Sequence, residues 1–165
     1  LEDYKYHTFD EIKNDINSNF IVILDHIEDP RNFGAIIRTS ECAGVDYIII
    51  PNKRSVEITP IVMKTSSGAL TNMKIVEVSN LRNTIDRLKE LNYWVIGTDA
   101  NGTNYTDIDY NGKVALVIGS EGNGLKEIVR KSCDVIASIP LKGKVNSLNA
   151  SVAAGIMIYE VVKSR

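Results

Sequence analysis

The sequence predicts an α/β fold built on a parallel β-sheet, and two observations lead to this prediction. Short apolar runs rich in β-branched residues alternate along the chain with segments of helical spacing. Most of these runs also lack polar alternation, which is typical of parallel strands covered by helices on both faces. Alternating strands and helices favour right-handed crossovers between parallel neighbours. We therefore expect about six strands in one parallel sheet that is flanked by helices.

Each expected strand and helix rests on a local signal. Gly44 is expected to end the second helix, Asn80 to cap the fourth, and Pro60 to occupy the first turn of the third, where proline is tolerated. The loosest piece is Asn101–Asn111, which carries Gly, Asn and Asp turn signals. The expected strands are Ile21–Leu24, Tyr47–Ile50, Met73–Val78, Trp94–Gly97, Val114–Ile118 and Val135–Ser138. The expected helices are Phe9–Ile16, Phe33–Ala43, Thr59–Thr65, Leu81–Leu91, Leu125–Lys131 and Asn149–Lys163.

The composition is that of an ordinary globular domain. The 165 residues are enough for a single domain with a real core, and 44% of them are hydrophobic and 24% charged. No apolar run is long enough to span a membrane and no signal segment is recognisable, so we expect a cytoplasmic protein with no membrane partner. Cys42 and Cys133 lack metal-ligand spacing, and we expect them to be buried free thiols.

The net charge of -2 excludes binding of polyanions through overall charge alone. If the chain binds nucleic acid, it needs a local basic patch or help from another segment. Five basic residues near the motifs described below could form such a patch facing an RNA backbone, although each is equally well explained as a solvated surface side chain. These residues are Arg31, Lys53, Arg54, Lys142 and Lys144.

Unusual polar residues follow four of the expected strands. They occupy Asp25–Asn32, Thr98–Asn101, Gly119–Gly124 and Ile139–Asn149. Ligands of open parallel sheets bind beyond the carboxyl ends of the strands. Because three of the four segments belong to the second half of the chain, we expect the functional site there.

The glycine-rich segment Gly119–Gly124 has two interpretations. Its glycines allow close backbone approach, so it could cradle a phosphate, or it could be a plain turn from strand to helix. The Lys-Ser/Thr pair of a P-loop is missing and the spacing is not that of a dinucleotide fingerprint. Glu121 would repel phosphate but could orient a hydroxyl group or a cation.

The segment Asp29–Ser40 contains a second candidate. Gly34 is expected to open a helix, and Arg38 falls one turn further on, at the end of an apolar pattern. An arginine at such a border often has only a structural role, in which its aliphatic stem covers apolar surface and its guanidinium group stays in water. The functional alternative is an arginine aimed at a phosphate or a ribose.

The last quarter of the chain is the most informative. Asn146, Ser147, Asn149 and Ser151 offer more polar groups than the capping of one helix needs. The small residues that follow, at 150 and 153–155, would let another backbone come close. We expect a ligand-holding loop followed by a tightly packed helix.

Histidine and metal chemistry is not indicated. His7 and His26 lie in different segments without a His or Cys partner at ligand spacing, and a serine elbow is absent. We expect both histidines to be surface or structural residues, and we predict no metal site.

Together, three segments resemble the motifs of the SpoU/TrmH family of RNA ribose 2′-O-methyltransferases, within the SPOUT superfamily. They are Asn32-x-Gly-Ala-x-x-Arg38, Ile118-Gly-Ser-Glu-Gly-Asn-Gly124, and Ile139-Pro with Ser147-Leu-Asn149. The motifs occur in order at strand exits, and the resemblance covers nearly the whole chain from about Phe20 onward. In detail the chain is most similar to bacterial enzymes that methylate a guanosine ribose in 23S ribosomal RNA.

The resemblance implies the α/β knot fold, in which the C-terminal segment threads through a loop to form a deep trefoil. It also implies S-adenosylmethionine as cofactor, S-adenosylhomocysteine as product, RNA as partner, and a homodimer formed through the knot region. We expect residues 1–18 to be a linker with an N-terminal helix and residues 19–165 to be the catalytic domain. The N-terminal RNA-binding domain typical of such enzymes is expected to be absent from this chain.

Matching positions imply the site residues. Arg38 matches the arginine proposed to act on the 2′-hydroxyl, either as base or, since guanidinium is a poor base, as the group that orients the ribose–phosphate while an RNA phosphate relays the proton. The implied catalytic residues are Asn32, Arg38, Glu121, Ser147 and Asn149. The implied cofactor-binding residues are Thr98, Asp99, Ala100, Gly119, Ile139, Leu141 and Leu148.

Three alternatives stay open at this point. The same chemistry on transfer RNA is close behind, because substrate choice would lie largely in a segment outside the catalytic domain. A catalytically idle RNA-binding or assembly factor is disfavoured, since all five catalytic positions are intact. A nicotinamide-dependent oxidoreductase is disfavoured because its glycine loop would follow the first strand rather than the fifth.

Overall fold

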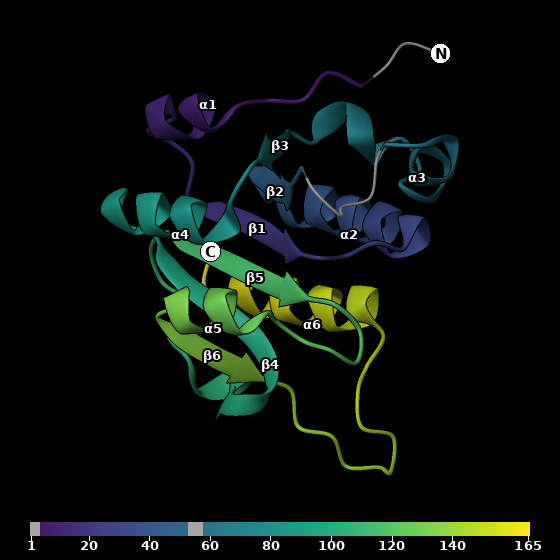
Figure 1. Cartoon of the computed structure of the whole chain (residues 1–165), viewed down its shortest axis with the longest axis vertical. Helices are drawn as coiled ribbons and strands as arrows, with labels where there is room; N and C mark the ends of the chain where they lie inside the picture. Colours follow the sequence, from purple (N-terminus) through teal and green to yellow (C-terminus); the bar gives the residue numbers. More distant parts are fainter. Residues whose placement is uncertain (1–3, 53–57) are drawn as a thin grey trace.

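The computed structural model describes residues 4–52 and 58–165, and a single sheet of six parallel strands runs through it (Figure 1). The order across the sheet is β3-β2-β1-β5-β4-β6, and every neighbouring pair is parallel. The α/β class and the six strands predicted from the sequence are confirmed. The strands are β1 (Phe20–Asp25), β2 (Tyr47–Pro51), β3 (Ile75–Val78), β4 (Trp94–Asn104), β5 (Val114–Gly119) and β6 (Val135–Ser138).

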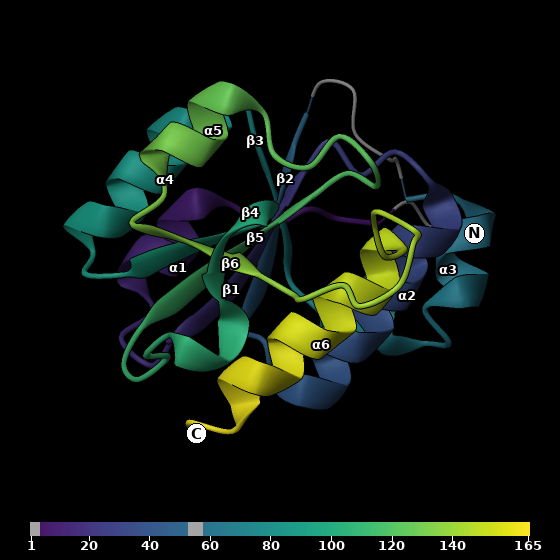
Figure 2. The ribbon, with the colours of Figure 1, turned by 90° about the horizontal axis from the view of Figure 1, so that it is seen from below.

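Helices cover both faces of this sheet (Figure 2). One face carries α1, α4 and α5, and the other carries α2, α3 and α6. The helices are α1 (Phe9–Asn14), α2 (Pro30–Ala43), α3 (Pro60–Thr65), α4 (Leu81–Glu90), α5 (Glu127–Ser132) and α6 (Ala150–Val162), with 3₁₀ turns η1 (Ala69–Asn72) and η2 (Tyr105–Asp107).

Each face of the sheet has its own hydrophobic core, because successive strand residues point to opposite faces. In β1, Val22 and Leu24 pack in the core with α2 and α6, whereas Ile21 and Ile23 pack in the core with α4. All four side chains are at most 1% exposed. This burial on both sides explains why the apolar run of the strand carries no polar alternation.

The winding of the chain changes direction at the centre of the sheet. From β1 the chain builds β2 and β3 outward on one side. It then crosses to the other side, where β4 forms first, β5 fills the place between β1 and β4, and β6 is added at the outer edge of β4. The change falls between β1 and β5, where Asp25 pairs with Gly119. Such a switch point opens a crevice at the carboxyl ends of the two strands.

Helix α2 begins three residues earlier than the sequence predicted. Asp29 caps it by accepting a 2.8 Å hydrogen bond from Arg31 N, and Pro30 occupies the first turn. Gly34 therefore lies inside the helix instead of opening it. A Cβ at Gly34 would lie 1.7 Å from Thr65 Oγ1, so the glycine allows α2 and the end of α3 to approach closely. Gly44 ends the helix with a φ of 81°, as predicted.

The segment predicted to be loosest is partly ordered as strand. Strand β4 continues to Asn104, and its pairing with β6 shifts register between Thr98 and Thr103. The turn signals in this region mark an irregularity within the strand and the 3₁₀ turn η2 that follows. A second difference concerns α5, which begins at Glu127 instead of Leu125, because Lys126 has extended backbone.

The two cysteines differ from each other. Cys133 is half-buried rather than fully buried, and its burial raises the pKa of the free thiol to about 12. The prediction of a buried thiol is wrong for Cys42, which is exposed. Cys42 falls off the buried stripe of α2, which runs through Phe33, Ile37 and Ser40.

No helix in residues 4–52 and 58–165 combines the length and the apolar character that crossing a bilayer requires. The segment between β6 and α6 contains no helix or strand and leads from the edge of the sheet to α6 (Figure 2). The trefoil knot expected in this region stays a prediction.

The stability of the fold should fall at high pH through Tyr93. The Tyr93 hydroxyl lies 2.6 Å from Ser18 Oγ, just before β1, and burial raises the pKa of Tyr93 to about 12. In the unfolded chain the phenol loses its proton near its ordinary pKa of about 10. The folded state therefore holds the proton longer, and the contribution of Tyr93 to stability is lost as the pH rises from about 10 through 12.

Denaturant unfolding across this pH range provides the measurement. We predict a shallower decline of the unfolding free energy in Tyr93→Phe than in the unchanged protein. Tyr159→Phe serves as the matched control, because the Tyr159 side chain is 47% exposed. An identical decline in all three proteins would contradict this role of Tyr93.

Candidate functional site

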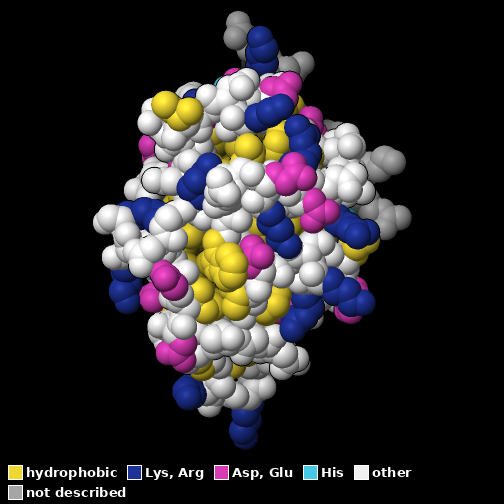
Figure 3. All heavy atoms as spheres, turned by 90° about the vertical axis from the view of Figure 1, so that its left-hand side faces the viewer, with side chains coloured by type: hydrophobic (Ala, Val, Ile, Leu, Met, Phe, Trp, Pro, Cys, Tyr) yellow, Lys and Arg dark blue, Asp and Glu magenta, His cyan; other side chains and the backbone are white. Residues whose placement is uncertain are grey.

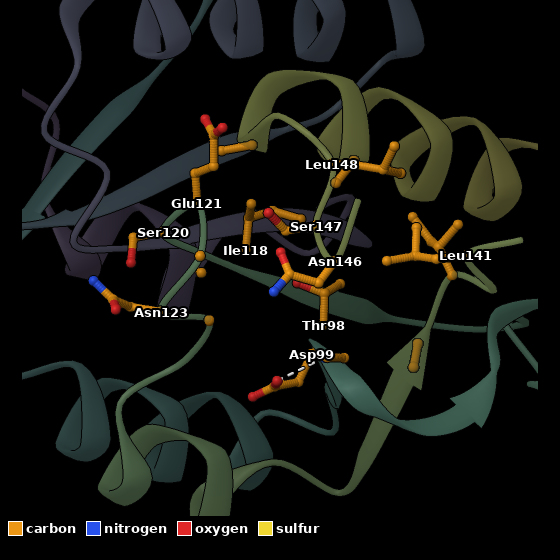
Figure 4. Close-up of a pocket in the computed structure, with 18 residues that line it drawn as sticks. Thr98, Asp99, Ile118, Ser120, Glu121, Asn123, Leu141, Asn146, Ser147 and Leu148 are labelled. Atoms are coloured by element: carbon orange, nitrogen blue, oxygen red, sulfur yellow. Dashed lines mark hydrogen bonds between the residues drawn. The ribbon is translucent and has the colours of Figure 1, made fainter. Parts of the chain in front are cut away.

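A cavity opens beyond the carboxyl ends of β5 and β6 and beside the middle of β4, and residues from the segment between β6 and α6, among them Leu141, Ser147 and Leu148, line it (Figure 4). Four segments of the chain converge there, although they lie far apart in sequence. The lining residues are Thr98, Asp99 and Ala100 of β4; Ile118, Gly119, Ser120, Glu121, Gly122, Asn123 and Gly124 around the end of β5; Ala137 and Ile139 around the end of β6; and Leu141, Asn146, Ser147, Leu148, Ala150 and Ala153 beyond them.

The glycine-rich segment forms a tight loop that folds back on the end of β5. Ser120 N donates to Gly124 O at 3.2 Å, and Gly124 N donates to Ser120 O at 2.9 Å. A Cβ on Gly119 would lie 2.4 Å from the carbonyl carbon of Gly124, so only glycine permits this approach. Gly122 and Gly124 have φ of 81° and 63°, which glycine adopts without strain. The loop thus presents backbone, with little side chain, to the cavity.

The β4 wall of the cavity is held by an ion pair. Asp99 accepts a 2.7 Å hydrogen bond from Ala100 N, and its other oxygen lies 2.9 Å from Arg130 Nη1 of α5. Arg130 Nη2 also donates to Asn101 O at 2.8 Å. Thr98 Oγ1 donates to Val117 O of the adjacent strand at 2.9 Å. These bonds fix the direction in which the Asp99 carboxylate faces the cavity.

The wall of the cavity that lies across from the glycine loop is apolar. Leu141 and Leu148 lie on the side of the cavity away from Ser120 and Asn123 (Figure 4). Ile139 continues this wall at the end of β6. The cavity can therefore hold a ligand that has one apolar part and one polar part.

Two of the predicted catalytic residues meet at the rim of this cavity. Asn149 Nδ2 donates to Glu121 Oε2 at 3.3 Å. The other atom of the Asn149 amide caps α6 by accepting from Ser151 N at 3.0 Å and from Val152 N at 3.3 Å. Asn149 therefore couples the start of α6 to the glycine loop, and Ser147 lines the cavity beside it.

The charge of the cavity restricts its ligand. Asp99 and Glu121 are carboxylates, and among the described residues that line the cavity none is Lys or Arg. Because Arg130 already pairs with Asp99, the uncompensated charge at the cavity is that of Glu121, which disfavours a phosphate close to the rim and favours a positively charged group there. Within residues 4–52 and 58–165 no group of three or more His, Cys, Asp or Glu side chains could hold a metal ion.

The structure thus brings together most of the predicted site residues. All seven residues expected to bind the cofactor line the cavity, as do Glu121 and Ser147, and Asn149 bonds to Glu121. The remaining predicted site residues lie elsewhere. Asn32 and Arg38 are on α2, outside the lining of the cavity, and the Arg38 Nη1 atom donates to Ser67 Oγ at 3.3 Å.

The predicted basic patch is spread over several segments. Arg31 is exposed near the start of α2, and Lys142 and Lys144 are exposed in the segment between β6 and α6. Lys53 and Arg54 lie outside the described residues. The cavity and the exposed lysines therefore share one segment, between β6 and α6.

The sequence indicates no role for Arg130, and it places Asp25 in a polar segment after a strand without giving it a role. Arg130 lies on a short helix with no motif, and only the folded chain places it against Asp99. Asp25 is fully buried at the end of β1, where it contacts His26 Nδ1 and accepts a 2.8 Å hydrogen bond from Lys126 N. A polar residue directly after an apolar strand was the available signal for Asp25.

The family of the chain follows from its sequence. The model of the SpoU rRNA Methylase family matches residues 19–159. The chain belongs to this family. A relative from Staphylococcus haemolyticus, provisionally named a TrmH family tRNA/rRNA methyltransferase, is 47% identical over 167 aligned residues. The alignment covers 98% of this chain and 67% of that relative, and a relative from Staphylococcus saprophyticus with the same name is 46% identical at the same coverage.

Solved structures of SpoU/TrmH proteins share the fold. The SpoU methyltransferase AviRb from Streptomyces viridochromogenes, in complex with AdoMet, superposes with a TM-score of 0.84 at 29% identity, and the match covers 93% of this chain and 64% of AviRb. A TrmH-family RNA methyltransferase structure from Porphyromonas gingivalis has a TM-score of 0.83 at 26% identity, with 90% of this chain and 61% of that chain covered. The chain thus spans less than two thirds of both structures and has the fold of SPOUT methyltransferases.

The close approach of Gly119 to Gly124 leads to a prediction about the stability of the glycine loop. Gly119→Ala should destabilise the fold by about 1–3 kcal/mol, because the new Cβ overlaps the backbone of Gly124 and the loop must move. Denaturant unfolding measures the change. Gly155→Ala in α6 is the control, since its Cβ would lie 3.9 Å from the nearest atom and alanine favours a helix. Equal stability of Gly119→Ala and the unchanged protein would contradict the proposed close packing.

Proposed function

We propose that this SpoU-family chain transfers a methyl group from S-adenosylmethionine to a ribose 2′-hydroxyl of RNA, with a guanosine of 23S ribosomal RNA as the leading target. The observation that carries the proposal is the cavity beside the middle of β4 and the ends of β5 and β6, in which all seven expected cofactor residues meet. The family match over residues 19–159 supports the reaction, and the AdoMet complex of AviRb supports the cofactor. We propose residues 19–165 as the catalytic unit, in a cytoplasmic protein.

The chemistry of the lining fits S-adenosylmethionine. The apolar wall formed by Ile139, Leu141 and Leu148 suits an adenine, whose edge can bond to backbone groups. The carboxylate of Asp99 is an acceptor for ribose hydroxyl groups. With Asp99 paired to Arg130, the remaining carboxylate of Glu121 suits a ligand that carries a sulfonium, whereas it disfavours the phosphates of a nicotinamide cofactor.

The chain contributes placement and charge to the reaction. When bound, S-adenosylmethionine supplies an electrophilic methyl group on a good leaving group. The protein must align the ribose 2′-oxygen with that methyl group, and alignment alone contributes several kcal/mol, up to about 7–11 kcal/mol in favourable cases. Glu121, held by Asn149, is the rim residue placed to orient the incoming ribose. Ser147 shapes the cavity wall next to it.

Arg38 and Asn32 need a second copy of the chain in this proposal. Within one chain neither residue lines the cavity, although both belong to a motif that the family resemblance assigns to catalysis. A homodimer through the region of α6 would let α2 of one copy approach the cavity of the other. Arg38 would then orient the ribose–phosphate, and a neighbouring RNA phosphate would take the proton, because guanidinium is a poor base.

The RNA is expected to lie along the rim of the cavity. Exposed basic residues lie beside it: Lys142 and Lys144 in the segment between β6 and α6, and Arg31 on helix α2. Contacts of such residues with the RNA backbone fix the register of the RNA without reading its sequence. The side of the molecule that is on the left in Figure 1 differs from such a surface, because Lys and Arg side chains are interspersed with Asp and Glu over it (Figure 3). Transfer RNA is the second candidate substrate, since the relatives carry a tRNA/rRNA name.

A methyl-transfer assay tests the proposed function and Arg38 together. The chain is incubated with methyl-labelled S-adenosylmethionine and with transcribed 23S ribosomal RNA or, separately, transfer RNA. We expect label in a 2′-O-methylated ribose of the ribosomal RNA, identified by mass spectrometry of the nucleosides. Arg38→Ala should lower the rate by about 100-fold or more while cofactor affinity stays within about twofold.

The control is Arg82→Ala, because Arg82 is an exposed arginine of α4 on the opposite face of the sheet. Its rate should equal that of the unchanged protein. Label found only on bases would overturn the ribose assignment. Loss of cofactor binding together with activity in Arg38→Ala would overturn the role given to Arg38.

A further inference from the structure

A second groove adjoins the cofactor cavity at the switch point between β1 and β5. Its lining includes His26 and Glu28 after β1 and Ser120, Asn123 and Lys126 after β5. Ser120 and Asn123 also line the first cavity, where they lie on the side away from Leu141 and Leu148 (Figure 4). The glycine loop therefore forms a shared wall, with the proposed methyl donor on one side and this groove on the other.

A buried carboxylate lies behind the groove and bonds to two of the residues that line it. Asp25 is 0% exposed, and it is the one carboxylate among the buried polar side chains of the described residues. Burying a charge is costly unless it is paired and hydrogen-bonded. Asp25 contacts His26 Nδ1 on one oxygen and accepts a 2.8 Å hydrogen bond from Lys126 N on the other. It thus ties together the two strand exits that form the groove.

The backbone at His26 is unusual as well. Its φ is 62°, in the left-handed region, which is uncommon for residues other than glycine although His, Asn and Asp adopt it more readily than the rest. Such conformations persist where the surrounding structure enforces them, and they cluster at functional sites. The His26 side chain is 23% exposed, with Nδ1 held by Asp25. A planar ring is therefore held in one orientation at the surface of the groove.

The side chains around this ring match the parts of a nucleotide. An imidazole can stack on a base, and single-stranded RNA is recognised by such stacking and by hydrogen bonds to base edges. The Glu28 carboxylate offers two acceptor oxygens, which fit the two adjacent N–H donors on the Watson–Crick edge of guanine. Lys126 supplies a cation for the neighbouring phosphate. The cofactor cavity, by comparison, lacks a cation among its described lining residues.

We propose that this groove binds one nucleobase of the RNA substrate, with guanine preferred, next to the ribose that receives the methyl group. The proposal rests on the proposed function, because it takes RNA to be the substrate. His26 stacks on the base, Glu28 accepts from its N–H groups, and Asp25 is a positioning residue that holds the His26 ring.

Nuclear magnetic resonance tests the groove without any methyl transfer. The chain has two histidines, so the ring signals of His26 can be followed with those of His7 as an internal control. His7 lies beside Glu11 near the N-terminus, away from the groove. The protein, with and without S-adenosylhomocysteine, is titrated with guanosine 5′-monophosphate, uridine 5′-monophosphate and inorganic phosphate.

We expect the His26 signals to shift with guanosine monophosphate, more weakly with uridine monophosphate, and not with phosphate alone. The His7 signals should stay in place, and Glu28→Gln should remove the preference for guanine. An equal response to phosphate alone, or no response of His26 to either nucleotide, would overturn the proposal. If the titration is positive but the methyl-transfer assay fails, the proposed function is overturned, whereas nucleotide binding in the groove still stands.

A second variant separates recognition from folding. His26→Asn keeps a residue that tolerates the left-handed backbone, and its amide can still donate to Asp25. It should unfold at the same denaturant concentration as the unchanged protein and raise the KM for RNA about fivefold or more, the range of one stacked base, with kcat unchanged within about twofold. An unchanged KM, or equal losses in kcat and stability, would reduce His26 to a structural residue.

Discussion

The hydrogen bond from Lys126 N to the buried Asp25 carboxylate is the interaction on which the site depends. It joins the end of β1 to the end of the glycine loop and so fixes the return of that loop over Gly119. The same bond places the start of α5, from which Arg130 reaches Asp99 on the wall of the cofactor cavity. One buried charge therefore organises the exits of β1, β4 and β5, and this explains why the fold tolerates its cost.

The part of the cavity wall that comes from the segment between β6 and α6 depends on a different constraint. The segment after β6 has no helix or strand, yet it must hold Leu141, Ser147 and Leu148 against the cavity. The Asn149 amide does this at one end, because it caps α6 and bonds to Glu121 at the same time. One side chain thus connects the start of α6, which packs on α2, to the glycine loop of the cavity.

The sequence was sufficient for the sheet and for most of the cavity, because apolar runs without alternation and polar residues at strand exits are local signals. It failed where the outcome depends on tertiary contacts. The extension of β4 to Asn104 follows from pairing with β6, and the left-handed backbone of His26 occurs where its ring contacts the buried Asp25. Arg130 carries no motif and gains its role only through α5. Arg38 fits a motif, yet a single chain leaves it outside the cavity.

The measurement that tests the central claim most directly is a calorimetric titration of the chain with S-adenosylmethionine and S-adenosylhomocysteine. Leu148→Arg places a charge in the apolar wall of the cavity, and Val145→Arg places the same charge on a side chain of the same segment that is 76% exposed and lies outside the lining. We predict saturable binding that is lost in Leu148→Arg and kept in Val145→Arg. Absence of binding in the unchanged chain, or full binding in Leu148→Arg, would contradict the assignment of this cavity to the methyl donor.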